Sequence, residues 1–387
     1  MASTSKAHIS NPKGKPERER YGIVSILRNL SPSRMPTFDD YYNALGANSG
    51  NLLFTNAVWR QLEGDKVRLN FKVDPAKAND KYSAIIFPAA NWIHTDVDFT
   101  PIAQSVEQLT IPVTIIGLGA QAPDYTSEQT VSDGMTKFLK AISERSHSLS
   151  VRGEYSKSVL NGLDIDNVTV TGCPSLYCDF KPFKKPVRPS LDPAKVLLHA
   201  TRYAAKHLAG KDQANDTNRK LYNFAYTNRM DLLYQSELEE MKILSGYHQW
   251  IDLSKSETSD LRTIYGARSD DNLQNFITHH GKLYTNIGKW SRSLDQYSYV
   301  IGTRLHGTIM ALNSGIPATL ITHDSRTQEM AEFARIPFIK ASDMDISAAG
   351  IKHAFESADF DAYYARREEN RAVYREFLLN NKINPSF

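Results

Sequence analysis

The apolar positions in the first half of the chain fall into short runs that alternate with stretches of helical spacing. Short apolar runs are typical of buried strands, and apolar residues three or four apart are typical of amphipathic helices. Alternating elements of this kind form βα units, whose strands pair into a parallel sheet. We expect strands at Ile23–Leu27, Ile85–Phe87, Val113–Leu118, Leu149–Val151 and Val168–Thr171, and helices at Ser49–Leu62, Thr100–Leu109, Ser127–Ser143 and Glu154–Leu163.

The segment from Asp179 to Pro193 interrupts this alternation, because it holds four prolines interleaved with basic residues. Prolines at that density exclude both a helix and a central strand, and the charges keep the segment in water. We therefore place a linker at residues 181–194, between an N-terminal domain at 21–180 and a C-terminal domain at 195–345.

The alternating pattern resumes after the linker. Two such units predict an α/β protein of two Rossmann-like, doubly wound domains facing a cleft, followed by a C-terminal helical segment at 346–387. In open sheets of this type ligands bind beyond the carboxyl ends of the strands. The expected strands are Val196–His199, Leu221–Tyr226, Tyr299–Gly302 and Ala318–Thr322, and the expected helices are Asn228–Leu244, Asp271–His279, Thr308–Asn313 and Arg326–Ala334.

Composition narrows the class of protein. A chain of 387 residues has room for two cores, and a net charge of only +3 argues against a nucleic-acid partner. It contains no apolar run long enough for an integral membrane segment, and the polar residues 1–20 predict a disordered tail without an export signal. We expect a cytoplasmic protein, with peripheral attachment to the inner face of the membrane left open.

The two cysteines, Cys173 and Cys178, do not form a disulfide framework. No second Cys or His pair stands beside them at the spacing of a zinc site. They predict reduced thiols, and we expect neither a bound metal nor a cofactor.

The most informative motif is Tyr299-Val-Ile-Gly-Thr-Arg-Leu-His-Gly-Thr308, where a buried strand ends and a helix follows. If Thr303–His306 stays extended, Arg304 and His306 face the same side, because alternate residues of a strand do so. A guanidinium and an imidazole at a helix N-terminus suit a phosphorylated substrate that needs proton transfer. A lone His would more often be a cap or a packed residue, but the paired Arg favours a site.

Two further strand ends carry arginines. Arg152 follows the strand that ends at Val151, and it is either a structural residue paired with Glu154 or an anion clamp in the cleft. Arg326 follows His323 and Asp324 after the strand that ends at Thr322, in a helix that Ser325 and Gln328 would open as a capping box. Because Arg326 opposes the helix dipole there, its position indicates a nearby anion.

Two glycine-rich segments complete the candidate site. Gly117, Gly119 and Ala122 match a dinucleotide-binding spacing, but no helix is expected to begin within the turn. We therefore prefer a tight strand-end turn that admits a ligand or the facing domain. The loop from Gly46 to Leu52 offers amide groups, either to an acceptor or only to itself. The candidate acceptor-binding residues are Asn48, Asn51, Gly119 and Asp324.

Several of these motifs, in their order along the chain, resemble the polysaccharide pyruvyl transferase family. The resemblance runs from about Gly46 to Phe333, with one departure: many members carry Asp-Pro where this chain has Cys-Pro, a change that we expect on the hinge side. The matching motifs are Ile116-Gly-Leu-Gly-Ala-Gln121, the Val-Arg-x-x-x-Ser of Val151 to Ser156, Thr171-Gly-Cys-Pro-Ser-Leu176, Gly302-Thr-Arg-Leu-His-Gly307, Gly315-Ile-Pro317 and the stretch from Asp324 to Glu329.

The resemblance implies a GT-B-like pair of domains that transfers pyruvate from phosphoenolpyruvate to two sugar hydroxyls, forming a cyclic ketal. It places the family's Arg-x-His motif on Arg304 and His306, its strand-end arginine on Arg152 and its later basic residue on Arg326. On residue chemistry, His306 would be catalytic and the arginines would bind phosphoenolpyruvate. The expected partners are phosphoenolpyruvate and a saccharide, free or lipid-linked, with a homo-oligomer allowed.

Two other functions fit the same architecture. A nucleotide-sugar glycosyltransferase would use an acidic residue such as Glu329 or Glu332 for the ribose, but it would leave Arg304 and His306 idle. A non-catalytic sugar-binding protein is the alternative from a different class.

Overall fold

The computed structural model describes residues 19–93, 98–122, 125, 129–180, 182, 185, 190–202, 212–247 and 261–387. Almost all of the predicted tail at 1–20 lies outside the described residues, and so does much of the proline-rich linker at 181–194. The tail, the linker and the domain boundaries around it therefore stay predictions.

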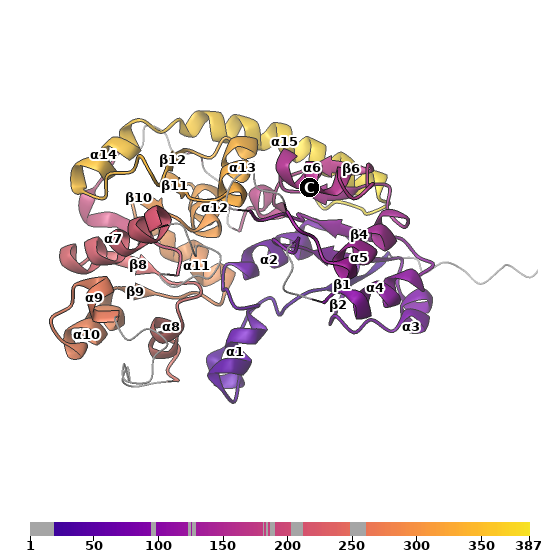
Figure 1. Cartoon of the computed structure of the whole chain (residues 1–387), viewed down its shortest axis with the longest axis horizontal. Coiled ribbons are helices and arrows are strands. Elements are labelled where there is room, and N and C mark those ends of the chain that lie inside the picture. Colours follow the sequence, from indigo (N-terminus) through magenta and orange to yellow (C-terminus); the bar gives the residue numbers. More distant parts are fainter. Residues whose placement is uncertain are drawn as a thin grey trace, which may run out of the picture.

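The first sheet is parallel throughout and lies in the N-terminal half of the chain (Figure 1). Four strands have the order β2-β1-β3-β4, and a parallel bridge between Leu118 and Val151 continues the sheet to the pair β5-β6. The buried strand β3 contains the predicted Ile85–Phe87, whereas β1 begins three residues before the predicted Ile23–Leu27 and ends at Val24. The strands are β1 (Arg20–Val24), β2 (Asp65–Leu69), β3 (Ala84–Pro88), β4 (Val113–Ile116), β5 (Leu149–Val151) and β6 (Val168–Val170).

Helices connect these strands and cover the sheet. The helix α2 packs into a core cluster that also contains residues of the second half, so one apolar cluster joins the two halves of the molecule. The helices are α1 (Phe38–Ala44), α2 (Asn51–Gln61), α3 (Pro75–Lys81), α4 (Thr100–Glu107), α5 (Asp133–Ser143) and α6 (Glu154–Asn161).

The second sheet has the strand order β12-β11-β10-β7-β8-β9 and is also parallel throughout. Its strands are β7 (Val196–His199), β8 (Asp231–Leu233), β9 (Gly281–Lys282), β10 (Tyr299–Gly302), β11 (Ala318–Thr322) and β12 (Phe338–Lys340). The helices of this half are α7 (Asp212–Asn228), α8 (Leu238–Leu244), α9 (Leu261–Tyr265), α10 (Asp270–His280), α11 (Ile287–Ser293), α12 (Leu305–Asn313) and α13 (Ser325–Ala334).

The structure corrects the sequence prediction in the second half. The strand expected at Leu221–Tyr226 is wrong, because these residues lie within α7. The helix expected at Asn228–Leu244 is wrong in its first part, which forms the strand β8 before α8 begins. Both errors come from short apolar runs, in which strand and helix spacing cannot be told apart.

Two helices close the chain, α14 (Ala348–Glu356) and α15 (Phe360–Asn380). The long helix α15 runs from the second half back over the first, along the top of Figure 1. The ring of Tyr374 on α15 stacks on Tyr177 with centroids 5.1 Å apart, and Arg367 donates to the Leu176 carbonyl over 2.8 Å. The predicted fold class, two doubly wound α/β halves and a C-terminal helix, is confirmed. Among the described residues, no helix has the length and apolarity needed to cross a bilayer.

Candidate active site at the strand ends

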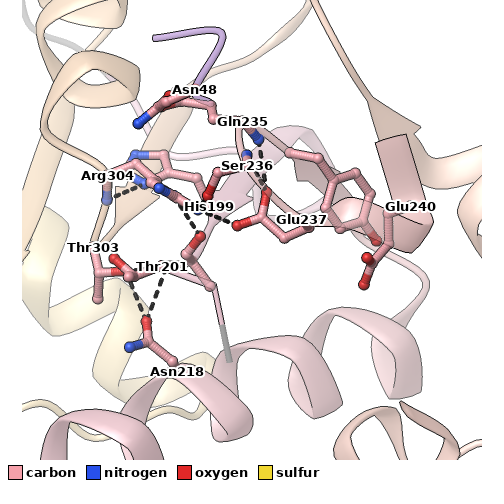
Figure 2. Close-up of polar contacts among 12 residues, drawn as sticks. Asn48, His199, Thr201, Asn218, Gln235, Ser236, Glu237, Glu240, Thr303 and Arg304 are labelled. Atoms are coloured by element: carbon pink, nitrogen blue, oxygen red, sulfur yellow. Dashed lines mark hydrogen bonds and ion pairs between the residues drawn. The ribbon is translucent and has the colours of Figure 1, made fainter. Parts of the chain in front are cut away.

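Arg304 lies at the centre of a polar network beyond the carboxyl ends of β7, β8 and β10 (Figure 2). Its Nε donates to the Ala200 carbonyl over 2.9 Å, and its Nη2 donates to Ser236 Oγ and to the Glu237 carboxylate. The side chain is mostly buried, and that of Glu237 fully so. These contacts fix the direction of the guanidinium before any ligand binds.

Glu237 is a buried member of this network that the sequence pattern did not reveal. Its other carboxylate oxygen accepts hydrogen bonds from the backbone N–H groups of Gln235 (2.7 Å) and Ser236 (3.0 Å). The carboxylate thus closes the turn after β8 and holds Arg304 at the same time. The sequence pattern predicts a helix across β8. Because of that error, no strand end, and so no candidate site residue, was expected near Glu237.

His199, the last residue of β7, fixes the turn that carries Arg304. Its Nδ1 accepts a hydrogen bond from the Arg304 backbone N–H over 2.9 Å. Burial, and then the charge of Arg304, lower the pKa of His199 to about 3, so the ring is neutral. A Cβ on Gly302 would stand 1.7 Å from the His199 carbonyl oxygen, so only glycine fits that approach. The strand-end rule was a signal that could have identified His199.

His306 lies in the first turn of α12, because that helix begins at Leu305, with Arg304 as its N-cap. The condition that Thr303–His306 stays extended is therefore met at Arg304 but not at Leu305 and His306. The imidazole is 8% exposed, its Nε2 lies 3.7 Å from Cys173 Sγ, and its ring packs on Phe54 with centroids 5.7 Å apart. Cys173, which stands where many family members have Asp, is thus a neighbour of His306, and its expected place on the hinge side stays a prediction.

The electrostatic surroundings of His306 are strongly positive. Burial lowers its pKa well below the usual value, and the charges of Arg152, Arg326 and Arg304 lower it further. All three predicted anion-binding arginines therefore act on one imidazole, although they come from three separate strand ends. Without a bound anion, His306 is neutral at neutral pH.

Arg152 is only 1% exposed and is held by backbone and amide oxygens. It donates to the carbonyl of Gly117 over 2.9 Å, to Asn91 Oδ1 over 2.9 Å and to the carbonyl of Ala89 over 3.5 Å. None of these acceptors carries a charge, so its partner in these bonds is not the carboxylate of Glu154. Among the described residues, the hydrogen bonds of Arg152 thus go to neutral acceptors, and a negative charge that acts on it comes from nearby Glu329.

Arg326 and its neighbours have unused hydrogen-bonding groups. Arg326 Nη2 lies 3.2 Å from Asp324 Oδ2, and the Arg326 side chain is 22% exposed. In this cluster, four of the buried atoms have no hydrogen-bond partner among the described residues: Arg326 Nε, Asp324 Oδ2 and both ring nitrogens of His323. Buried polar groups are rarely left unpaired in native proteins, so these atoms are candidates to form hydrogen bonds with a ligand.

The capping box at the start of α13 differs from the one predicted. Asp324 is the N-cap: it accepts from the Thr327 N–H over 2.8 Å, and Thr327 Oγ1 accepts in return from the Asp324 N–H. The predicted pair, Ser325 and Gln328, is wrong by one position. Burial would raise the pKa of Asp324, but Arg326, His323 and Thr327 outweigh it and lower that pKa, so the carboxylate is charged.

The two halves meet at Ser325 and Glu329. Ser325 Oγ donates to the Ala122 carbonyl over 2.9 Å, and Glu329 accepts from Ser156 Oγ over 2.7 Å and from the Ser156 N–H over 3.1 Å. Burial raises the pKa of Glu329 to about 7. These bonds hold the strand end that carries Arg152 against the one that carries Arg326.

The candidate acceptor residues lie in different settings. Asn48 Oδ1 accepts from the Gly50 N–H over 2.8 Å, and Figure 2 shows Asn48 beside Gln235 of the second half. Asn51 donates to the carbonyl of Gly46 over 2.9 Å and borders a cavity at the end of β1. Gly119 is buried, and a Cβ there would stand 2.9 Å from Arg152 Cδ. The absence of a side chain at Gly119 therefore leaves room for the side chain of Arg152.

Glu240, near this network, predicts a pH-dependent stability. Its Oε1 accepts from the Tyr265 hydroxyl over 2.7 Å, and burial raises its pKa to about 8. Because the folded protein holds this proton more tightly than the unfolded chain, the protonated carboxyl stabilises the fold fully at a pH below about 4.5, its pKa in the unfolded chain. This contribution is lost as the pH rises through about 8, its pKa in the folded protein. Relative to Glu240→Gln, the wild type should lose about 2–4 kcal/mol of unfolding free energy between pH 5 and pH 8.

Urea unfolding of both proteins at pH 5, 6.5 and 8 measures this difference. Glu376→Gln, on an exposed position of α15, serves as the control and should follow the wild type. Parallel pH curves for the wild type and Glu240→Gln would contradict the assignment.

Within the described residues, no group of three or more His, Cys, Asp or Glu side chains is placed to hold a metal ion. The fold and the strand-end cluster together define an α/β protein of two doubly wound halves with buried arginine and histidine side chains at its strand ends. The chain belongs to the polysaccharide pyruvyl transferase family, whose model matches residues 48–325. The family identified from the motifs is thus confirmed.

Comparison with curated proteins gives no match. Among solved structures, the chain is similar to a UDP-N-acetylglucosamine 2-epimerase from Rickettsia bellii, with 13% identity, a TM-score of 0.45 and coverage of 94% of this chain and 95% of that one. It is also similar to the UDP-GlcNAc 2-epimerase from Neisseria meningitidis bound to UDP-GlcNAc, with 12% identity, a TM-score of 0.43 and coverage of 94% and 100%. At these TM-scores, the fold class rests on the chain's own sheet order.

Proposed function

We propose that this protein transfers pyruvate from phosphoenolpyruvate to two hydroxyls of a sugar in a polysaccharide or its precursor, forming a cyclic ketal and releasing phosphate. Membership of the family supports pyruvyl transfer. The observation that carries the donor assignment is that the charges of Arg152, Arg326 and Arg304 all act on the buried imidazole of His306 and lower its pKa.

Phosphoenolpyruvate has a phosphate and a carboxylate, and guanidinium groups bind both kinds of anion through charge-assisted hydrogen bonds. Arg326 has an unpaired Nε for such a bond. Arg304 is aimed by Glu237, and Arg152 supplies positive charge from the first half. Because these groups supply the charge that phosphoryl oxygens require, we propose that the reaction needs neither a metal ion nor a cofactor.

The reaction begins with a proton delivered to the methylene carbon of phosphoenolpyruvate, which leaves C2 electron-poor. A sugar hydroxyl attacks C2 and loses its proton, and the C2–O bond to phosphate breaks. The second hydroxyl then attacks C2 and loses its proton, closing the ketal. A group that gives and takes protons near neutrality serves these steps, and His306 is the residue that we assign to them.

The low pKa of His306 is compatible with this role when the negative charges of the bound substrate are included. Burial, and then the arginine charges, hold the free imidazole neutral, and the phosphate and carboxylate of bound phosphoenolpyruvate would offset the arginine charges. The substrate would thereby raise the pKa of His306 and load it with the proton that the first step consumes.

The test is incubation of the protein with phosphoenolpyruvate and a panel of methyl hexosides and lipid-linked sugars. We expect phosphate release that depends on the acceptor, together with an acceptor mass raised by one pyruvate ketal, and both should persist in EDTA. Acceptor-independent hydrolysis alone, or transfer from a nucleotide sugar, would refute the proposal. Activity lost in EDTA and restored by magnesium would refute its metal-free form.

A further inference from the structure

Glu329 on α13 lies where the two halves meet, close to two of the arginines that we assign to the donor. It stands three positions after Arg326, and side chains three apart lie on the same face of a helix. Its carboxylate also faces the residue that follows Arg152, because a Cβ on Gly153 would stand 2.6 Å from Glu329 Oε2. One side chain therefore lies beside both strand ends, and the absence of a side chain at Gly153 leaves room for it.

The carboxylate of Glu329 caps a helix of the other half. The helix α6 begins at Glu154 with Gly153 as its N-cap, and a glycine has no side chain that could accept from the first N–H groups. Glu329 supplies that acceptor. Its Oε2 accepts from the Ser156 N–H over 3.1 Å and its Oε1 accepts from the Ser156 hydroxyl over 2.7 Å, so both oxygens are fixed in place.

Ser156 connects this contact to the turn that holds Arg152. Its Oγ, which donates to Glu329, also accepts from the Ala120 N–H over 3.0 Å. Ala120 lies in the turn after β4, and the Gly117 carbonyl at the start of that turn accepts from Arg152 Nε over 2.9 Å. The guanidinium is therefore connected to Glu329 by hydrogen bonds that run through Ser156 and this turn.

The charge of Glu329 would act on an anionic ligand in the opposite direction to these hydrogen bonds. Burial lowers the pKa of Arg152, and the negative charge of Glu329 offsets part of that effect. By charge alone, loss of Glu329 would strengthen the binding of phosphoenolpyruvate, because like charges repel. Loss of a group that positions Arg152 would weaken it, because an anion contact depends on the placement of the guanidinium. The two roles therefore predict opposite results.

We propose that Glu329 is a positioning residue of the donor site: by holding the start of α6 against the start of α13, it sets the separation of Arg152 and Arg326. The inference rests on the proposed pyruvyl transfer, because that function assigns both arginines to phosphoenolpyruvate. Glu329 is only 4% exposed, and it acts on the donor through Arg152 rather than by contact.

The test is calorimetric titration of phosphoenolpyruvate into Glu329→Gln and Ser156→Ala at pH 8. This pH lies above the value of about 7 to which burial raises the pKa of Glu329, so the wild type carries the carboxylate. Glu329→Gln removes the charge at constant size and replaces one acceptor oxygen with an amide that cannot accept from Ser156. Ser156→Ala leaves every charge in place and removes one of the two bonds.

We expect Glu329→Gln to weaken the binding of phosphoenolpyruvate about tenfold and Ser156→Ala about 2–5-fold. Arg152→Lys completes a double-mutant cycle. In that background Glu329→Gln should weaken binding by less than about twofold, because the guanidinium that Glu329 positions is already gone.

Two control variants should bind phosphoenolpyruvate like the wild type. Tyr297→Phe removes a hydrogen bond of 2.6 Å to Asp231 at the amino ends of the strands, so it lowers stability far from the arginines. Glu369→Gln removes an exposed carboxylate on α15. Urea unfolding of every variant separates lost stability from lost affinity.

Tighter binding by Glu329→Gln would make its role purely electrostatic, and unchanged binding with lowered stability would make it structural; either result overturns the inference. So does a tenfold effect of Glu329→Gln that persists in the Arg152→Lys background. Failure of the proposed function looks different: the wild type would bind inorganic phosphate but not phosphoenolpyruvate, and the variants would weaken phosphate in the same order. If neither anion binds, both proposals are wrong.

Discussion

Replacing His306 with alanine should lower kcat for pyruvyl transfer by about 10²–10⁴-fold while leaving the affinity for phosphoenolpyruvate nearly unchanged. The imidazole moves protons in the transition state, whereas the surrounding arginines bind the anions. The free imidazole is neutral, so its removal takes no charge away from the donor site, and the three arginines remain to bind the donor. Steady-state kinetics and calorimetric titration with phosphoenolpyruvate separate the two effects.

The same calorimetry tests the proton on His306. If bound phosphoenolpyruvate raises the pKa of the imidazole, binding near pH 7 must take up protons, and the measured enthalpy must depend on the ionisation enthalpy of the buffer. His306→Ala should abolish most of that uptake. A variant with near-normal kcat, or wild-type uptake that survives the substitution, would leave His306 as a packing residue.

Much of the site could be predicted because it follows buried strands. Val300 and Ile301 are an unambiguous apolar run, and the rule that ligands bind at strand ends directs attention to Arg304 and His306. The same reasoning located Arg152 after β5 and Arg326 after β11. Local sequence therefore identified residues that the fold brings together around one imidazole.

The partners of these residues could not be predicted in the same way. Glu237 lies 67 positions before Arg304, and their ion pair exists only because β8 and β10 flank β7 in the sheet. Strand order is a tertiary property that no local pattern encodes. Reading β8 as helix then hid the turn in which Glu237 stands.

The predictions of where α12 and α13 begin were inexact for a different reason. Leu305, His306 and Gly307 are compatible with both an extended segment and the first turn of a helix, and the structure begins α12 at Leu305 although Arg304, at the N-cap, makes no side-chain capping hydrogen bond. Asp324 with Thr327 and Ser325 with Gln328 are competing caps one residue apart. Ser325 instead bonds to Ala122 across the two halves, a contact that lies outside the reach of local spacing.

Replacing Arg304 with alanine should have two separable effects, because its guanidinium both holds a buried carboxylate and faces the donor site. The fully buried Glu237 would lose its ion partner, which should cost about 3–5 kcal/mol of unfolding free energy. The lost anion contact should cost about 2–4 kcal/mol in phosphoenolpyruvate binding. Urea unfolding measures the first effect and calorimetry the second.

The double variant Arg304→Gln, Glu237→Gln distinguishes these effects, because it removes both charges and keeps amide groups that can still bond to each other and to the turn after β8. We expect it to recover most of the stability that Arg304→Ala loses, but not the affinity for phosphoenolpyruvate. Glu237→Gln alone keeps the Arg304 guanidinium but removes the carboxylate that orients it. This variant should still bind phosphoenolpyruvate but should orient it less well, so kcat should fall more than the affinity for phosphoenolpyruvate. If the double variant binds phosphoenolpyruvate like the wild type, Arg304 is a structural partner of Glu237 and the anion site rests on Arg152 and Arg326.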